Sequence, residues 1–256
     1  MSTENVIEIR GLHKSFRNGR DKVLQGIDLD FPKGTLTYIL GPSGTGKSVL
    51  IKHILGLLHP DQGEIRVYGK NLADIPDRDL AEHRKVYGML FQNSALFDDR
   101  SIFENVAFPL REHTRLTEEE ITKKVNNTLS HLGLKGRYDK LPNELSGGMK
   151  KRVGLARAII REPSILLYDE PTTGLDPVTR TTVDSLIEQM KRELQLTSVV
   201  ISHDIPSALL LADHIAFLNQ GKVAFYGTPA EFRKCDHPLV MAFLEAEQRT
   251  VKALVQ

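Results

Sequence analysis

The sequence predicts an α/β fold, in which helices flank a mostly parallel sheet and a largely helical segment is inserted into the chain. Two observations predict it. Short apolar runs with the pattern of buried strands recur along the chain and alternate with segments of helical periodicity, as they do in parallel α/β proteins. Between about residues 97 and 162 the periodicity becomes mostly helical, which indicates the insert.

The N-terminal part is predicted to be an antiparallel β subdomain that leads into a buried strand and a helix. Asn18-Gly19 is typical of a tight turn between two strands, and 60–63 has the composition of a second turn. A helical pattern runs from Lys47 to about Leu58. The expected strands cover residues 6–9, 23–31, 36–40 and 64–68.

The rest of the chain alternates strands with helices around the helical insert. Thr117, followed by three glutamates, resembles a helix start. A final helix is expected from His237 onward, with its apolar part over 239–244. The expected strands cover residues 86–91, 165–168 and 198–201.

Length and patterning favour one domain with subdomains. We expect this domain to cover residues 1–245, with the helical subdomain at about 97–163 inserted in it. Residues 246–256 form a more polar tail, which is either a frayed helix end or a docking segment for a partner.

The composition excludes several classes of protein. Hydrophobic residues make up 40% of the 256, enough for a sizeable core and too many for a disordered chain. A net charge of +1 gives no sign of nucleic-acid binding. The single cysteine, Cys235, cannot form an internal disulfide, so a reducing cytoplasm is expected. The first ten residues lack the apolar core of a secretory signal, and no apolar run approaches the roughly 18–20 residues of a membrane span.

A phosphate-binding loop is predicted between the strand over 36–40 and the helix that follows. Its glycines allow a tight turn whose N–H groups point at phosphate oxygens, and the helix presents its positive end to the same anion. Lys47 would reach the β- and γ-phosphates of ATP, and the Ser48 hydroxyl would bind Mg²⁺. The alternative is a glycine-rich turn that matches by accident, which the flanking strand and helix disfavour. The loop consists of Gly41, Pro42, Ser43, Gly44, Thr45, Gly46, Lys47 and Ser48.

Two carboxylates follow the apolar strand over 165–168. Asp169 would lie at the C-terminal edge of the sheet, where ligands of open α/β sheets bind, and would hold Mg²⁺ through a water. Glu170 would polarise the attacking water. Taken alone, the pattern also fits a strand followed by an acidic turn, but beside a phosphate loop the catalytic interpretation is favoured.

The residues that identify a family are Leu145, Ser146, Gly147, Gly148 and Met149. With the helical run that follows, this chain resembles the ATPase subunits of ABC transporters, whose signature is usually LSGGQ. Here methionine replaces the glutamine. The resemblance covers the chain up to about residue 245 and implies a RecA-like P-loop NTPase core.

A serine and two glycines at a helix start make a second anion-binding end, which suggests the ATP of a second protomer. The predicted arrangement is a head-to-tail homodimer, in which Ser146 and Gly148 of one copy cap the γ-phosphate held by Lys47 of the other. Alone, the motif is as often a helix cap. The basic run over 150–152 is interpreted as a solvated helix face that also raises the potential near phosphate.

The resemblance assigns roles to four further residues. Gln92 resembles the residue that touches Mg²⁺ or the water and signals to the membrane partner, and otherwise it is a surface glutamine. Asp176 resembles the aspartate at the dimer seam, with a turn aspartate as the alternative. His203 resembles the histidine that senses the γ-phosphate. Phe16 resembles the aromatic residue that stacks on adenine, although a core position is as plausible. The other eight histidines show no spacing of metal ligands.

A finer resemblance is to the MlaF-type ATPases, carried by 41–50, 90–98, 103–110, 145–152 and 168–176. It implies phospholipid transport between the membranes of a diderm bacterium. The implied partners are an MlaE-type integral-membrane permease, an MCE-domain lipid-binding protein and a STAS-domain protein of the MlaB type, with the chain peripheral on the cytoplasmic face of the inner membrane.

A permease is required if lipid is the cargo. Exposing about 30 methylenes of a phospholipid to water costs on the order of 25 kcal/mol, at about 0.8 kcal/mol per CH₂. Two other functions remain open: an ABC transporter ATPase for another small substrate, and a non-transport ABC protein of translation or DNA repair. The single phosphate loop and the lack of long heptad stretches disfavour the second.

Overall fold

The computed structural model describes residues 4–245 and confirms the predicted α/β class. The chain divides into two compact units, which are described separately. The first comprises Met1–Arg84 and Thr197–Gln256, and the second comprises Lys85–Leu196. Among the described residues, no helix has both the length and the hydropathy needed to cross a bilayer.

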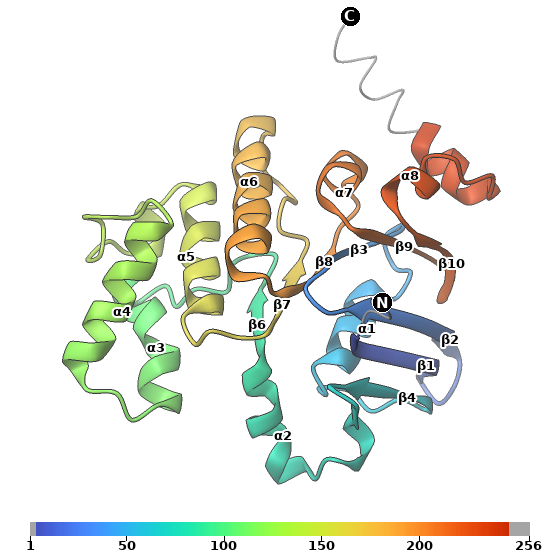
Figure 1. The fold of residues 1–256 in the computed structure, drawn as a ribbon, viewed down its shortest axis with the longest axis horizontal. Helices are drawn as coiled ribbons and strands as arrows, with labels where there is room; N and C mark the ends of the chain where they lie inside the picture. Colours follow the sequence, from blue (N-terminus) through green and yellow to red (C-terminus); the bar gives the residue numbers. More distant parts are fainter. Residues whose placement is uncertain (1–3, 246–256) are drawn as a thin grey trace, which may run out of the picture. The chain divides into compact units, whose positions relative to one another are not determined.

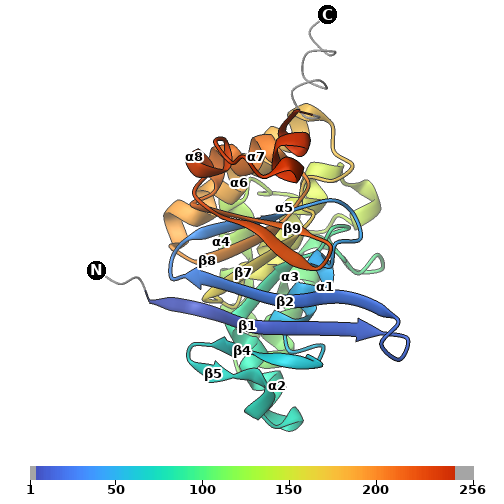
Figure 2. The same cartoon turned by 90° about the vertical axis from the view of Figure 1, so that its right-hand side faces the viewer.

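The first unit contains an antiparallel sheet with the strand order β2-β1-β4-β5 (Figure 2). The strand predicted over 6–9 is much longer than expected, because β1 continues to pair with β2 as far as Phe16. The turn predicted over 60–63 is partly strand, since β4 begins at Gln62. The bounds are β1 Asn5–Phe16, β2 Asp21–Pro32, β4 Gln62–Val67 and β5 Lys70–Asn71.

The mostly parallel strands of the first unit surround β3, Leu36–Leu40, all five of whose residues are buried. The strand β3 pairs in parallel with β8, Thr197–Ile201, and with β9, His214–Asn219. The strand β10, Lys222–Gly227, pairs with β9 antiparallel. Full burial confirms the buried-strand pattern from which β3 was predicted.

Short helices complete this unit. The helix α1, Lys47–Ile54, ends earlier than predicted, because the chain turns at Gly56 with a φ of 62°. A terminal helix covers residues 238–245, and the rest of the predicted helix and the tail lie outside the described residues. The other helices are the 3₁₀ turn Leu72–Asp74, α2 Asp77–His83, α7 Ile205–Leu211 and α8 Pro229–Phe232.

The second unit combines a parallel pair of strands with four helices. The pair consists of β6, Tyr87–Leu90, and β7, Ile165–Asp169. The helix α5 packs against α3, α4, α6 and β6. The helices are α3 Ile102–His113, α4 Glu118–His131, α5 Gly147–Ile159 and α6 Pro177–Leu194, with 3₁₀ turns at Arg84–Val86 and Pro142–Glu144. The predicted helical insert lies within this unit, where α3, α4 and α5 are coloured green to yellow in Figure 1.

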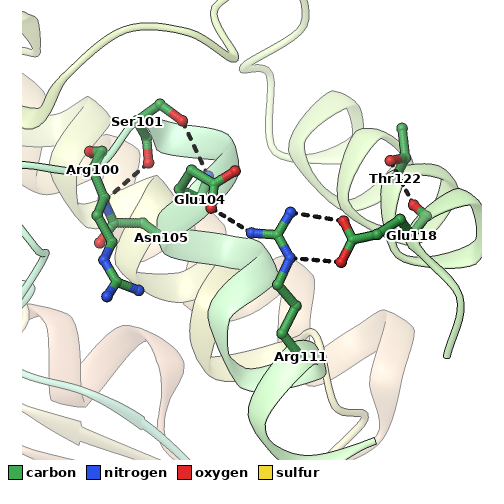
Figure 3. A network of polar contacts seen from close by, with 7 residues as sticks. All are labelled: Arg100, Ser101, Glu104, Asn105, Arg111, Glu118 and Thr122. Carbon is green, nitrogen blue, oxygen red and sulfur yellow. Dashed lines mark hydrogen bonds and ion pairs between the residues drawn. The ribbon is translucent and has the colours of Figure 1, made fainter. Parts of the chain in front are cut away.

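Charged and polar side chains fix α3 beside α4. Arg111 near the end of α3 donates hydrogen bonds to both carboxylate oxygens of Glu118 on α4, at 2.9 and 2.8 Å, and also pairs with Glu104 (Figure 3). Thr117 begins α4 with a capping box, in which its hydroxyl accepts from the Glu120 N–H and the Glu120 carboxylate accepts from the Thr117 N–H. The predicted helix start at Thr117 is confirmed.

Candidate functional site

The loop between β3 and α1 has the backbone conformation of an anion cradle. Gly41, Gly44 and Gly46 have positive φ values of 146°, 80° and 99°. A Cβ atom on Gly41 would lie 2.2 Å from the carbonyl oxygen of Leu218. Only glycine therefore fits where the loop leaves β3, and the chain can turn sharply enough to direct successive N–H groups inward.

The side chain of Lys47 holds the loop in this shape. The Lys47 ammonium donates to the carbonyl oxygens of Gly41 at 2.7 Å and Pro42 at 2.8 Å. Lys47 as a whole is only 7% exposed. The Thr45 hydroxyl donates to the same Pro42 oxygen at 2.9 Å. Ser48 follows as the second residue of α1 and is exposed. Because the first turn of α1 contains no acidic residue, the helix end and the lysine together fit a phosphate chain.

His203 follows a strand that ends at the same edge of the sheet as the phosphate loop. The strand β8 runs parallel to β3, and the Ser202 N–H donates to the Ile39 carbonyl oxygen at 3.2 Å. His203 is the next residue and is exposed, while Asp204 caps α7 through the Ser207 N–H at 3.2 Å. The topology thus brings His203 and the phosphate loop to one edge.

Phe16 is the last residue of β1 and is 37% exposed. The Lys14 ammonium lies 5.7 Å from the centre of its ring. The alternative that Phe16 is a core residue is wrong, because a core side chain would be buried. The exposed ring can take part in stacking with a planar ligand.

In the second unit, β6 and β7 carry their functional residues to a common edge. Leu90 pairs with Tyr168, so that Gln92, two residues beyond β6, lies at the end where Asp169 closes β7. Glu170 follows with a φ of 48° and accepts a hydrogen bond from the Thr173 hydroxyl at 2.7 Å. That bond restricts the direction in which the Glu170 carboxylate can point.

A lysine from α5 joins this edge, which sequence reasoning missed. Lys151 is 5% exposed, and its ammonium donates to the backbone carbonyl of Gln92. Burial lowers the pKa of Lys151, and the negative charges of Asp169 and Glu170 oppose that shift. The interpretation of 150–152 as a solvated helix face is therefore wrong for Lys151. The only feature of the sequence that indicates the burial of Lys151 is its place among the apolar positions of the helix.

The signature motif forms the start of α5. The Ser146 hydroxyl caps the helix by accepting from the Met149 N–H at 3.3 Å, and Gly147 and Gly148 are its first two residues. A Cβ on Gly148 would lie 3.0 Å from the Thr179 side chain, so the helix start packs closely against α6. Ser146 and Gly147 are nevertheless exposed, which leaves this helix end accessible to an anion.

Asp176 caps α6 rather than standing in an ordinary turn. Its carboxylate accepts from the N–H groups of Val178 and Thr179 at 3.0 Å and from the Thr179 hydroxyl at 2.5 Å. These hydrogen bonds from Thr179 and Val178 lower the pKa of Asp176. In the signature motif, the Met149 sulfur accepts from the Arg137 guanidinium at 3.3 Å.

The donor atoms suit magnesium better than a transition metal. Within residues 4–245, no group of three or more His, Cys, Asp or Glu side chains could hold a metal ion. The residues predicted to bind Mg²⁺ from the sequence are Ser48, in the first unit, and Gln92 and Asp169, in the second, and this assignment stays a prediction. All three are hard oxygen donors, and Mg²⁺ is ordinarily bound by one or two carboxylates together with substrate phosphates and waters.

Comparisons with known proteins agree with the phosphate loop and the signature motif described above. The sequence profile of the ABC transporter family matches residues 24–173. The chain is 43% identical to the intermembrane phospholipid transport system ATP-binding protein MlaF of Haemophilus influenzae, over 95% of this chain and 92% of that protein. It is 39% identical to the probable ribonucleotide transport ATP-binding protein mkl of Mycobacterium tuberculosis, over 94% of this chain and 67% of that protein.

Solved structures are similar as well. CbiO1 from Clostridium perfringens, part of the ABC transporter complex cbiONQ, is 32% identical with a TM-score of 0.82, over 95% of this chain and 99% of that one. The ATP-binding cassette MJ0796, solved as a dimer bound to ADP and Pi, is 31% identical with a TM-score of 0.78. The match covers 87% of this chain and 98% of that one.

Proposed function

Because this chain belongs to the ABC transporter family and is an ATP-hydrolysing subunit, we propose that it powers phospholipid transport between the inner and outer membranes of a diderm bacterium. The ATP-hydrolysing form of the protein would be a head-to-tail homodimer with two ATP molecules in its interface. The observation that carries the dimer is the presence of two helix starts with anion-binding character, α1 and α5, in one chain.

In this arrangement each γ-phosphate meets donors from both protomers. Lys47 and the phosphate loop of one copy hold it, and Ser146, Gly147 and Gly148 of the other copy cap it. The closed dimer then exists only while the γ-phosphate is attached, which is the differential contact that a ligand-driven switch requires. The dimeric form of MJ0796 supports this proposal. Asp176 would lie at the seam, where its capping of α6 fixes its direction.

Glu170 would align and polarise the attacking water, with its carboxylate oriented by the Thr173 hydroxyl. His203 would sense the γ-phosphate, and Phe16 would stack on adenine. Mg²⁺, when bound by Ser48, Asp169 and Gln92, would neutralise charge on the phosphates. Phosphoryl transfer needs little covalent chemistry from the protein. The residues of the chain would therefore act by positioning the reactants and by stabilising charge.

The cargo assignment is supported by the MlaF relatives from Haemophilus influenzae and Escherichia coli, which align over at least 90% of their own length. The mycobacterial relatives, named for ribonucleotide transport, support a second candidate at slightly lower identity. Lipid as cargo requires a permease that shields the acyl chains. We therefore propose an MlaE-type permease, an MCE-domain protein and a STAS-domain protein of the MlaB type as partners, with this chain on the cytoplasmic face of the inner membrane.

Partner capture tests the proposal. Native membranes are solubilised gently, the tagged chain is captured, and co-purifying proteins and lipids are identified by mass spectrometry, with the untagged strain as the control. The expected result is a multi-span permease, an MCE-domain protein and bound phospholipid. A permease with a soluble solute-binding protein would contradict the lipid cargo. Ribosomal or DNA-repair proteins without a permease would contradict transport itself.

A further inference from the structure

One face of α5 holds the segment that follows β6, residues 91–95. Lys151, Gly154 and Arg157 are spaced three apart, so they lie along one side of the helix. Lys151 donates to the carbonyl oxygen of Gln92, and Arg157 donates to that of Ser94 at 2.8 Å. We call these three residues the strap.

At Gly154, in the middle of the strap, the backbone of α5 lies close against Leu90 and Ser94. A Cβ on Gly154 would lie 2.9 Å from the Leu90 side chain, 3.1 Å from the Ser94 Cβ and 3.4 Å from the Ser94 carbonyl oxygen. Ser94 is 2% exposed, and its N–H closes a turn onto the Phe91 carbonyl at 2.9 Å. Glycine at 154 therefore lets α5 approach near enough for both cations to reach the segment.

The chain just beyond this segment, residues 97–101, is held by α3. Asn105 is fully buried, and its amide nitrogen donates to the carbonyl oxygens of Arg100 and Ser101 at 3.0 Å (Figure 3). The same nitrogen also donates to the Phe97 carbonyl oxygen at 3.1 Å. The Arg157 guanidinium lies 5.7 Å from the Phe97 ring centre. Residues 92–101 are therefore fixed to the helices of the second unit at both ends.

The two cations of the strap, Lys151 and Arg157, depend on these carbonyl oxygens for hydrogen bonds. Lys151 is buried and Arg157 is half-buried, and a charge removed from water needs hydrogen-bonding partners nearby. Carbonyl oxygens supply them and are in turn oriented by the cations. Because Lys151 follows Gly147 by four residues, its backbone lies about one helical turn along α5 from the signature glycines, an axial rise of roughly 6 Å.

We propose that Lys151 and Arg157 are positioning residues that make residues 92–94 move with the start of α5 as one body. The inference rests on the proposed function for the importance of Gln92 and Ser146 in hydrolysis. A γ-phosphate bound at the signature of α5 would then set the position of Gln92 through side chains of a single helix. The strap itself is a property of the second unit without nucleotide.

Hydrogen–deuterium exchange of the full chain without nucleotide tests the strap. Lys151→Met and Arg157→Met keep most of the side-chain volume and remove the donors. We expect amide exchange in 92–97 to become at least about tenfold faster in both variants, because the carbonyls lose their anchors. Lys150→Met removes the neighbouring charge but leaves the donor to Gln92 in place, and its exchange in this segment should match the wild type.

Kinetics then test positioning. In Lys151→Met we expect kcat for ATP to fall at least about tenfold while KM and the Kd for a fluorescent nucleotide change less than about twofold. Lys151→Arg should restore a large part of both kcat and slow exchange. If Lys151→Met does not fold, Arg157→Met carries the test of donor loss, and Lys151→Arg, which keeps a donor, should retain slow exchange.

Unchanged exchange in both Lys151→Met and Arg157→Met would overturn the strap. Faster exchange with wild-type kcat would overturn the positioning role while leaving the contacts. A wild-type chain that hydrolysed no ATP would instead refute the proposed function, and the exchange result would still decide whether the strap exists.

Discussion

At the residue scale, the phosphate loop is organised around one ammonium group. Lys47 donates to two carbonyl oxygens of its own loop, at Gly41 and Pro42, and is nearly buried. With ATP bound, the same group can turn from these neutral acceptors to phosphate oxygens, where charge-assisted hydrogen bonds are stronger. We therefore expect Lys47 to serve both the shape of the loop and the affinity for nucleotide.

Replacing Lys47 by alanine should weaken ATP binding about 10- to 100-fold, because hydrogen bonds to charged groups contribute about 1.5–3 kcal/mol. Titration with a fluorescent ATP analogue measures this change. Lys52→Ala removes an exposed lysine from the same helix and should bind ATP as the wild type does. Equal affinity for Lys47→Ala and Lys52→Ala would contradict the assignment of the phosphate loop.

Single residues differ in how well the sequence predicts them. The glycines and Lys47 could be predicted because a phosphate loop is a local motif whose spacing fixes its backbone. The burial of Lys151 could not, since it depends on β6 and β7 arriving beside α5. The roles of Gln92, Glu170 and His203 stay predictions, because they depend on a bound nucleotide.

At the scale of elements, α4 depends on its first turn. It is largely polar, and its buried residues are Ile121, Val125 and Leu129, so packing fixes only one face. The capping box of Thr117 and Glu120 satisfies N–H groups that the helix itself leaves without acceptors. Arg111 on α3 then ties the same turn through Glu118.

Thr117→Ala should destabilise the chain by about 1 kcal/mol, the usual cost of losing a threonine cap. Urea unfolding followed by circular dichroism measures it. Thr122→Ala is the matched control, because Thr122 lies inside the same helix and its hydroxyl only donates back to the Glu118 carbonyl at 2.7 Å. Alanine there should be neutral or slightly stabilising. Equal destabilisation by the two substitutions would refute the role of the cap.

Elements were predictable where local chemistry decides them. The strand β3 matches its expected range because all five of its residues are buried and only Thr37 among them is a small polar residue. The length of β1 could not be predicted, since its polar second half forms a strand only by pairing with β2. The early end of α1 depends on the left-handed turn at Gly56, which the apolar pattern continuing to Leu58 conceals.

At the scale of the whole molecule, the α/β class followed from periodicity, and the ABC family followed from motif order. The division of the chain into two compact units could not be predicted from the sequence. The second unit extends from Lys85 to Leu196, beyond the helical insert expected at about 97–163, because α5 packs on β6 and β6 pairs with β7. Periodicity along the chain carries no information about such packing.

In the proposed cycle, ATP joins two copies of this chain and hydrolysis separates them. Size-exclusion chromatography with light scattering on Glu170→Gln measures this directly, because the variant should bind ATP with Mg²⁺ but not hydrolyse it. We expect the mass of two chains with ATP and of one chain with ADP. Glu170→Gln combined with Lys47→Ala should remain a monomer with either nucleotide. A Glu170→Gln chain that stays monomeric in saturating ATP, or hydrolyses it at the wild-type rate, would contradict the proposed cycle.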